Sequence, residues 1–142
     1  MRFWDTSALV PLLITETSSA GARRAYELDP EMITWWSTEV ECVSALTRLE
    51  RAGGLTIDGL GNALRRLDAL SLAWHEIHPG QRVREIAVRL LRVHPLRASD
   101  ALQLAAAIMS AEERAATLEF VTLDDRLADA ADREGFPVVR PD

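Results

Sequence analysis

Short apolar runs of strand length alternate with longer stretches of helical periodicity, and this alternation limits the fold more than any other feature of the sequence. The apolar runs lie at residues 2–4, 32–36, 74–77, 119–123 and 137–139. Strands that alternate with helices pair in parallel, because each helix carries the chain back to the start of the next strand. The sequence therefore predicts an α/β fold with a mainly parallel sheet, in a single domain over residues 1–142.

Helices are expected in the segments between these runs. A strongly amphipathic one follows Ser37 and Thr38, and Gly53 ends it. The segment from Ala98 to Met109 is apolar on nearly every side, which predicts a buried central helix. The other helices are expected at residues 8–10, 20–28, 56–72, 81–93 and 125–133.

Cysteine content and hydropathy indicate in which cellular compartment the protein is expected. The lone cysteine, Cys42, cannot form an intrachain disulfide, and no Cys/His cluster has the spacing of a zinc site. No stretch has the length and hydropathy of a membrane span, and the N-terminus is unlike a secretory signal. We therefore expect a soluble cytoplasmic protein that binds neither structural zinc nor a membrane.

The formal net charge of −6 argues against one class of nucleic-acid binder, the proteins that coat a polyanion through clustered positive charge. It does not exclude a nuclease, because a cation held between carboxylates and a phosphate reverses the local sign of the field. All 16 basic residues are arginines, a preference that we attribute mainly to genome composition.

Four acidic residues stand where helices are expected to begin. Asp5 and Asp124 follow apolar runs, and Glu41 and Asp100 occur early in helices. In open parallel sheets, ligands bind beyond the carboxyl ends of the strands, where the strand order reverses, so Asp5 and Asp124 should both lie at that edge. Divalent cations such as Mg²⁺ prefer oxygen ligands and can activate a water while offsetting the charge of a phosphate. The four carboxylates together therefore indicate metal-dependent chemistry on a phosphate.

Each acid taken alone also has a structural interpretation, because a carboxylate in the first turn of a helix caps free N–H groups and interacts favourably with the helix dipole. Thr38-x-x-Glu41 fits a capping box, and Thr122-x-x-Asp125 fits one with a shorter acid. Asp100 is the least ordinary of the acids. The apolar residues after it draw it toward the interior, where a carboxylate needs partners.

Longer motifs surround these acids. They are Phe3-Trp4-Asp5-Thr6-Ser7-Ala8-Leu9-Val10, Glu41-Cys42-Val43-Ser44-Ala45-Leu46-Thr47-Arg48, Leu96-Arg97-Ala98-Ser99-Asp100-Ala101-Leu102-Gln103-Leu104-Ala105 and Phe120-Val121-Thr122-Leu123-Asp124. In type and order they resemble the motifs of PIN-domain proteins, especially the toxins of bacterial VapBC toxin–antitoxin pairs. The resemblance covers essentially the whole chain, and four motifs in order are far more specific than any one of them.

The resemblance implies a three-layer sandwich with a five-stranded parallel sheet between helices. It also implies Mg²⁺- or Mn²⁺-dependent endoribonuclease activity, a role as the toxin of a type II pair, and a small antitoxin protein as partner. The implied metal ligands are Asp5, Glu41, Asp100 and Asp124, and the implied supporting residues, which hold water molecules at the metal, are Thr6, Ser7 and Thr122.

Two assignments stay open. Glu39 lies two residues before Glu41 on the other edge of the same apolar stripe, and only the spacing to the following Ser-Ala-Leu motif favours Glu41. Asp125 adjoins Asp124 in the same way, and we interpret it as the helix-start acid. Gln103 stands where relatives often carry histidine, so the resemblance gives this side chain no role.

Arg48 lies two turns after Glu41 on a neighbouring face of the helix. It is a candidate for contact with an RNA phosphate or an antitoxin carboxylate, and an exposed structural arginine is the alternative. Trp4, Trp35 and Trp36 have the chemistry to stack on bases. We interpret them instead as core or dimer-interface residues, and we expect a homodimer.

Other function classes fit the sequence less well. His75, His78 and His94 lie near turns without partners at ligand spacing, so we assign them no catalysis. A phosphoaspartate hydrolase would carry a second acid two residues after Asp5, where Ser7 stands. A receiver domain would need a lysine, and the chain has none. The remaining alternative is a catalytically silent PIN-fold module that binds RNA or protein.

Overall fold

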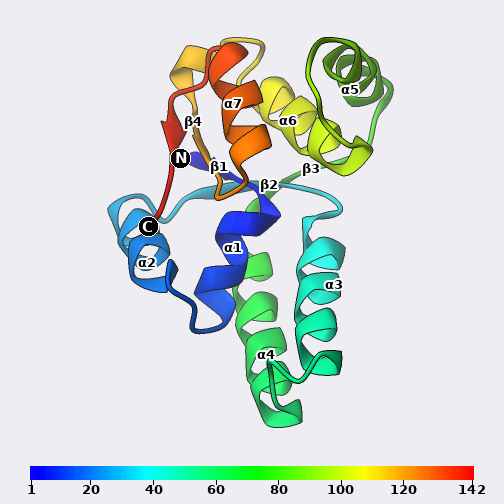
Figure 1. Cartoon of the computed structure of the whole chain (residues 1–142). Helices are drawn as coiled ribbons and strands as arrows, with labels where there is room; N and C mark the ends of the chain where they lie inside the picture. Colours follow the sequence, from blue (N-terminus) through cyan, green and yellow to red (C-terminus); the bar gives the residue numbers. More distant parts are fainter.

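The computed structural model describes residues 1–142 and contains five strands and seven α-helices. The strands are β1 (Arg2–Trp4), β2 (Met32–Trp35), β3 (His75–Ile77), β4 (Glu119–Val121) and β5 (Val138–Val139). The helices are α1 (Thr6–Leu13), α2 (Ser19–Leu28), α3 (Thr38–Arg51), α4 (Ile57–Ala73), α5 (Gln81–Val93), α6 (Ala98–Ser110) and α7 (Asp125–Arg133), with a 3₁₀ turn at Ala115–Thr117. All five strands pair in parallel, in the order β3-β2-β1-β4-β5 (Figure 1).

The central strand is β1, with β2 on one side and β4 on the other. In the register of the sheet, Trp4 is aligned with Val121 of β4, and Phe3 with Ile33 of β2. The chain builds one half of the sheet outward from β1 through β2 to β3, and then crosses back to add β4 and β5. The strand order therefore reverses between β1 and β4, which makes the carboxyl ends of these strands the expected ligand-binding edge.

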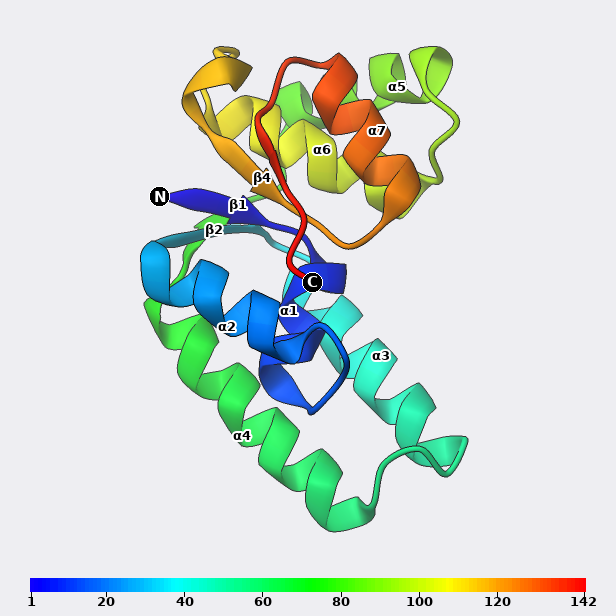
Figure 2. The ribbon, with the colours of Figure 1, turned by 60° about the vertical axis from the view of Figure 1, so that its left-hand side comes forward.

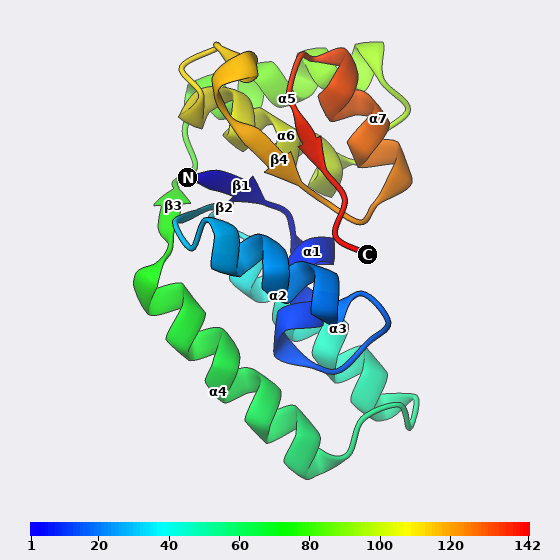
Figure 3. The ribbon, with the colours of Figure 1, turned by 90° about the vertical axis from the view of Figure 1, so that its left-hand side faces the viewer.

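Helices cover both faces of the sheet, so the domain has three layers (Figures 2 and 3). On one face, α5, α6 and α7 surround a core that includes Phe3 and Phe120, whose rings stack with centroids 5.3 Å apart. On the other face, α1 to α4 surround Trp4 and Val121. Successive residues of a strand point to opposite faces, and β1 accordingly gives Phe3 to one core and Trp4 to the other. The predicted three-layer α/β fold is confirmed.

Most predicted elements agree with the structure to within one or two residues. The helices α5 and α7 match their predictions, and α6 is the expected buried helix. Helix α1 is longer than predicted, since it continues past Pro11 to Leu13. The burial of Leu9 and Leu13 holds this last turn against the core although proline donates no backbone hydrogen bond. None of the helices combines the length and hydropathy that a membrane span requires.

Candidate active site

The reversal in strand order brings Asp5 and Asp124 to one edge of the sheet. Asp5 directly follows β1, and its backbone N–H donates to the carbonyl of Val121, the last residue of β4, over 3.1 Å. Asp124 follows β4 after two further residues and is the N-cap of α7. The first turns of α3 and α6 supply Glu41 and Asp100. Each of the four predicted acids thus comes from a different segment of the chain.

Two hydroxyl groups link the carboxylate after β1 to the loop after β4. Ser7 Oγ donates to Asp5 Oδ1 over 2.8 Å and accepts from the backbone N–H of Leu123 over 2.9 Å. It also lies 3.3 Å from Thr122 Oγ1, which accepts from the backbone N–H of Asp124 over 3.0 Å. Ser7 therefore orients the Asp5 carboxylate, and Thr122 fixes the backbone at Asp124.

Glu41 is held by side chains from three elements. Ser37 Oγ donates to Glu41 Oε2 over 2.5 Å, and Thr6 Oγ1 donates to Glu41 Oε1 over 3.2 Å. Gln103 Nε2 of α6 lies 3.2 Å from Oε2 and 3.4 Å from Oε1. Glu39, the alternative acid, is exposed. The tertiary contacts thus bring Glu41, and not Glu39, beside Thr6 and α6.

Electrostatic effects connect the acids to one another. Asp5 is 4% exposed, and burial raises its pKa from 3.8 to about 7 against the opposing hydrogen bonds of Ser7 and Thr122. The charge of Asp124 adds to this increase. Burial also raises the pKa of the half-buried Asp100, and the charges of Asp124 and Glu41 raise it further. The charged forms of Asp5 and Asp100 are therefore disfavoured, in part by the charges of Asp124 and Glu41.

Capping contributes to the site, but not in the form of the predicted capping boxes. Asp124 Oδ1 accepts from the backbone N–H of Leu127 over 2.8 Å, so this acid caps α7. Thr122 and Asp125 do not form the capping box that was the structural alternative here, because the Thr122 hydroxyl accepts from the N–H of Asp124. Asp125 is exposed and pairs with Arg140.

The capping box that was the structural alternative at Thr38 and Glu41 is not formed either. Ser37 occupies the N-cap position of α3, and it makes no side-chain capping bond. The Thr38 hydroxyl is fully buried and accepts instead from Gln103 Nε2 over 3.1 Å. Asp5 likewise stands at the N-cap of α1 and makes no side-chain capping bond.

The donor chemistry of the site fits a hard divalent cation. The donors are carboxylates and hydroxyls, and the buried Asp5 has no cationic side chain among the groups that shift its pKa. No group of three or more Asp, Glu, His or Cys side chains lies close enough to bind one ion directly. Mg²⁺ commonly uses one or two carboxylates and retains several waters. The set therefore suits an ion bound partly through water rather than one in a closed cage of protein ligands.

Two exposed arginines flank the acidic edge. Arg97 precedes the first turn of α6, Arg126 lies in the first turn of α7, and the charges of both act on Asp100 to lower its pKa. Both side chains are exposed. Arg48, the arginine singled out in the sequence, is exposed on α3. Arg97 and Arg126 were not predicted as site residues, because only the tertiary structure brings α6 and α7 together.

Gln103, Ser37 and Thr38 were also missed as site residues. The available signal was the position of Gln103, which is the only polar side chain from Ala101 to Met109. An uncharged polar group in so apolar a helix must find a partner inside the protein.

The aromatic and histidine residues lie largely outside the site. Trp4 and Trp35 are buried core residues, as predicted, whereas Trp36 is 52% exposed. His94, for which no catalytic role was predicted, has a partner far along the chain. Its ring is buried, and Nε2 lies 2.7 Å from Glu134 at the end of α7.

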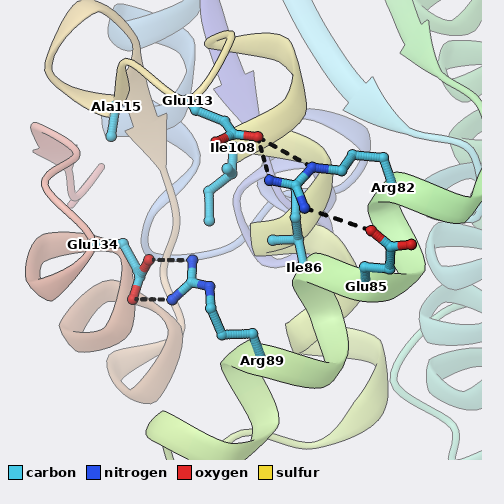
Figure 4. A pocket seen from close by; sticks show the side chains of 8 residues that line it. All are labelled: Arg82, Glu85, Ile86, Arg89, Ile108, Glu113, Ala115 and Glu134. Carbon is cyan, nitrogen blue, oxygen red and sulfur yellow. Dashed lines mark hydrogen bonds and ion pairs between the residues drawn. The ribbon is translucent and has the colours of Figure 1, made fainter.

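A cavity of about 370 Å³ opens beside α5, away from the acids (Figure 4). It lies at the C-terminal ends of α6 and α7, whereas Asp100 and Asp124 stand at the N-terminal ends of these helices. Its two arginines are already paired, Arg82 with Glu113 and Arg89 with Glu134. These pairs connect α5 to the ends of α6 and α7, and they leave no free positive charge for an anion.

Comparisons with known proteins agree with the fold and its motifs. A family model described as PIN domain matches residues 2–133 of the chain. A search of curated proteins gives no match. Among solved structures, a toxin–antitoxin complex from Klebsiella pneumoniae is 23% identical, covers 100% of this chain and 98% of that chain, and has a TM-score of 0.67.

Two other solved structures are similar over nearly their whole length. VapC20 of Mycobacterium tuberculosis, a toxin that cleaves the sarcin–ricin loop, is 21% identical, covers 99% of this chain and 100% of that chain, and has a TM-score of 0.71. FitAcB of Neisseria gonorrhoeae is 16% identical, covers 99% of this chain and 98% of that chain, and has a TM-score of 0.69. At these identities the likeness establishes a common fold.

Proposed function

The chain belongs to the PIN-domain family, and on this premise we propose that it is a Mg²⁺- or Mn²⁺-dependent endoribonuclease that acts as the toxin of a toxin–antitoxin pair. One observation carries the proposal: four carboxylates from four segments share the edge where the strand order reverses, and the most buried of them, Asp5, has no cationic partner. Carboxylates in such a group must either protonate or bind cations.

The acids Asp5, Glu41, Asp100 and Asp124 would hold the metal. When bound, a divalent cation supplies positive charge that activates water and offsets the charge of the phosphodiester. The protein's own side chains then have distinct tasks. Ser7 and Thr122 orient Asp5 against β4, and Thr6 holds Glu41 at the start of α1.

RNA is the substrate that we propose, and two observations support it. One of the structural relatives is described as a toxin that cleaves the sarcin–ricin loop, which is an RNA. In addition, Arg97 and Arg126 stand exposed beside Asp100, where they can contact the phosphates next to the cleaved bond. Arg48, farther along α3, is the less direct candidate for such a contact.

A small antitoxin is the partner that we propose, since one relative is a toxin–antitoxin complex. From the sequence, an antitoxin is expected to dock on apolar residues of the early helices, through Leu12, Leu13 and Leu49. This expectation needs correction, because Leu13 is fully buried. Leu12 instead lines a groove of about 290 Å³ formed with residues of α2 and α4. This groove, which we call the α1–α4 groove, is lined by Leu12, Arg23, Tyr26, Arg66, Ala69 and Leu70.

Apolar side chains of an antitoxin segment would fill the floor of the α1–α4 groove, and its carboxylates would meet the two arginines at the rim. We also propose that the chain forms a homodimer, which light scattering of the purified protein would test.

The experiment that tests the function is cleavage of structured cellular RNAs by the purified protein, with Mg²⁺ or Mn²⁺ and with excess chelator. We expect cleavage with the metal, none with the chelator, and none by an Asp5→Asn variant that folds normally. Undiminished cleavage in chelator would disprove the metal mechanism. Binding of RNA without any cleavage would favour a silent binding module instead.

A further inference from the structure

Gln103 is a buried polar side chain that lies one turn after Asp100 in α6. It is 1% exposed, and the residues on either side of it belong to the apolar surface of the helix. Its Nε2 lies 3.1 Å from Thr38 Oγ1, 3.2 Å from Thr6 Oγ1, and 3.2 Å from Glu41 Oε2. One amide nitrogen thus connects α6 to the starts of α1 and α3.

The chemistry of Glu41 fixes which end of the amide faces it. A carboxylate only accepts hydrogen bonds, so the NH₂ group, and not the carbonyl, must point toward it. Thr6 accepts from Gln103 and donates its own hydroxyl hydrogen to Glu41 Oε1 over 3.2 Å. The two hydrogens of this NH₂ group are shared among Glu41, Thr6 and Thr38, and through Thr6 the amide also supports the other oxygen of Glu41.

Packing alone does not account for a glutamine here. Gln103 Oε1 is buried and has no hydrogen-bond partner in the protein. An unsatisfied buried acceptor destabilises the fold, and an apolar side chain of similar size would avoid this loss of stability in the same helix. The benefit of the glutamine lies in its NH₂ group, whose charged partner is Glu41.

We propose that Gln103 is a positioning residue that fixes the Glu41 carboxylate in the orientation needed to bind the metal. The inference rests on the proposed function, because it assigns Glu41 the part of a ligand. Glu41 is a flexible side chain near the surface, and donors from Ser37, Thr6 and Gln103 restrict it. Groups that orient a metal ligand typically contribute 10–100-fold to metal affinity.

The test compares Mn²⁺ binding by the full-length protein and its variants, measured from the signal of free Mn²⁺ in electron paramagnetic resonance. Gln103→Met keeps the length of the side chain and removes the donor, and Gln103→Leu provides a second apolar variant. We expect each to raise the dissociation constant for Mn²⁺ about 10–100-fold. Leu104→Met, a change of the neighbouring buried residue, should leave the constant unchanged.

A second comparison asks whether Gln103 acts through Glu41. In a Glu41→Gln background, Gln103→Met should have little further effect on Mn²⁺ affinity, since the group that it orients is no longer a carboxylate. Kinetics provide another readout. Gln103→Met should lower kcat for RNA cleavage at fixed Mn²⁺ while the KM for RNA stays constant.

Two results would overturn the inference alone. The first is that Gln103→Met binds Mn²⁺ as tightly as the unmutated protein does. The second is that Gln103→Met weakens Mn²⁺ binding by the same factor in the unmutated protein and in the Glu41→Gln background. If the unmutated protein binds no Mn²⁺, the proposed function fails as well, and the two failures are thereby distinguished.

Discussion

The hydroxyl of Ser7 lies 2.8 Å from Oδ1 of Asp5 and donates a hydrogen bond to it. This bond favours the charged form of Asp5, whereas burial favours the neutral form and is the larger effect. The metal-free protein therefore holds Asp5 near the midpoint of its titration at neutral pH, with a pKa of about 7.

Stability of the metal-free protein should depend on pH through Asp5. Because burial raises the pKa of Asp5 from 3.8 to about 7, the folded protein holds this proton more tightly than the unfolded chain does. The contribution to the free energy of unfolding is present below pH of about 4 and is lost as pH rises to about 7. It amounts to about 4 kcal/mol at most. Asp5→Asn should flatten this part of the profile.

Urea unfolding at a series of pH values, in excess chelator, measures this slope. Ser7→Ala is the matched variant, because it removes a bond to the charged form and should extend the loss of stability to higher pH. Identical pH profiles for the unmutated protein and Asp5→Asn would show that Asp5 titrates normally.

Asp100→Asn should stabilise the metal-free protein or leave its stability unchanged. Burial raises the pKa of Asp100, and the charges of Asp124 and Glu41 raise it further. Two carboxylates ~5 Å apart repel by about 3 kcal/mol at an effective dielectric near 20. The melting temperature of the unmutated protein should rise with Mn²⁺, and that of the variant should rise much less. Thermal melts with and without Mn²⁺ measure both effects.

Asp58, in the first turn of α4, provides the control for an ordinary helix-start charge. Asp58→Asn should cost a few tenths of a kcal/mol to about 1 kcal/mol and retain the full Mn²⁺ response. If Asp100→Asn behaves in the same way as Asp58→Asn, then Asp100 is a structural residue and not a metal ligand.

Arg97→Gln and Arg126→Gln should each weaken RNA binding and raise KM with little change in kcat. If each arginine contacts one phosphate, the slope of log affinity against log salt concentration should fall by about one for each substitution. Filter binding in chelator over a range of salt concentrations measures this slope. Arg51→Gln, at the far end of α3, is the control and should leave it unchanged. A loss of affinity without a change in slope would rule out phosphate contact.

Ala69→Arg should prevent inhibition by the antitoxin while RNA cleavage continues. Ala69 lines the α1–α4 groove and is exposed, so a large side chain would fill the groove without disturbing the core. Leu72→Arg, on the same helix and 90% exposed, should leave inhibition intact. The measurement is copurification of the proposed antitoxin, a small protein encoded beside this one, with each variant, together with an RNA cleavage assay. Equal inhibition of both variants would place the antitoxin elsewhere.

The sequence predicted the fold and the shared edge of Asp5 and Asp124 because both depend on local pattern and on a general rule of parallel sheets. Each acid follows an apolar run, and parallel strands end at the same edge. The choice between Glu39 and Glu41 was different. Both lie in the first turn of α3, where periodicity does not separate them, and only contacts with Thr6 and Gln103 distinguish their positions.

Tertiary contacts override several local patterns of the sequence. Thr38 and Thr122 both fit capping boxes, yet their hydroxyls bond to Gln103 and to the backbone of Asp124. His94 had no nearby partner in the sequence, because Glu134 reaches it only when α5 and α7 pack on the same face. Such contacts join residues far apart in the chain, and a pattern read along the sequence does not contain them.

The strand order also has a consequence for the synthesis of the chain. The first strand to leave the ribosome, β1, lies in the middle of the sheet, and its neighbour β4 is made only after α6. Until then Asp5 has neither the Val121 carbonyl nor Asp124 beside it. A nascent chain that has not yet reached β4 therefore contains only part of the site, and the four acids can come together only after β4 and Asp124 have been made.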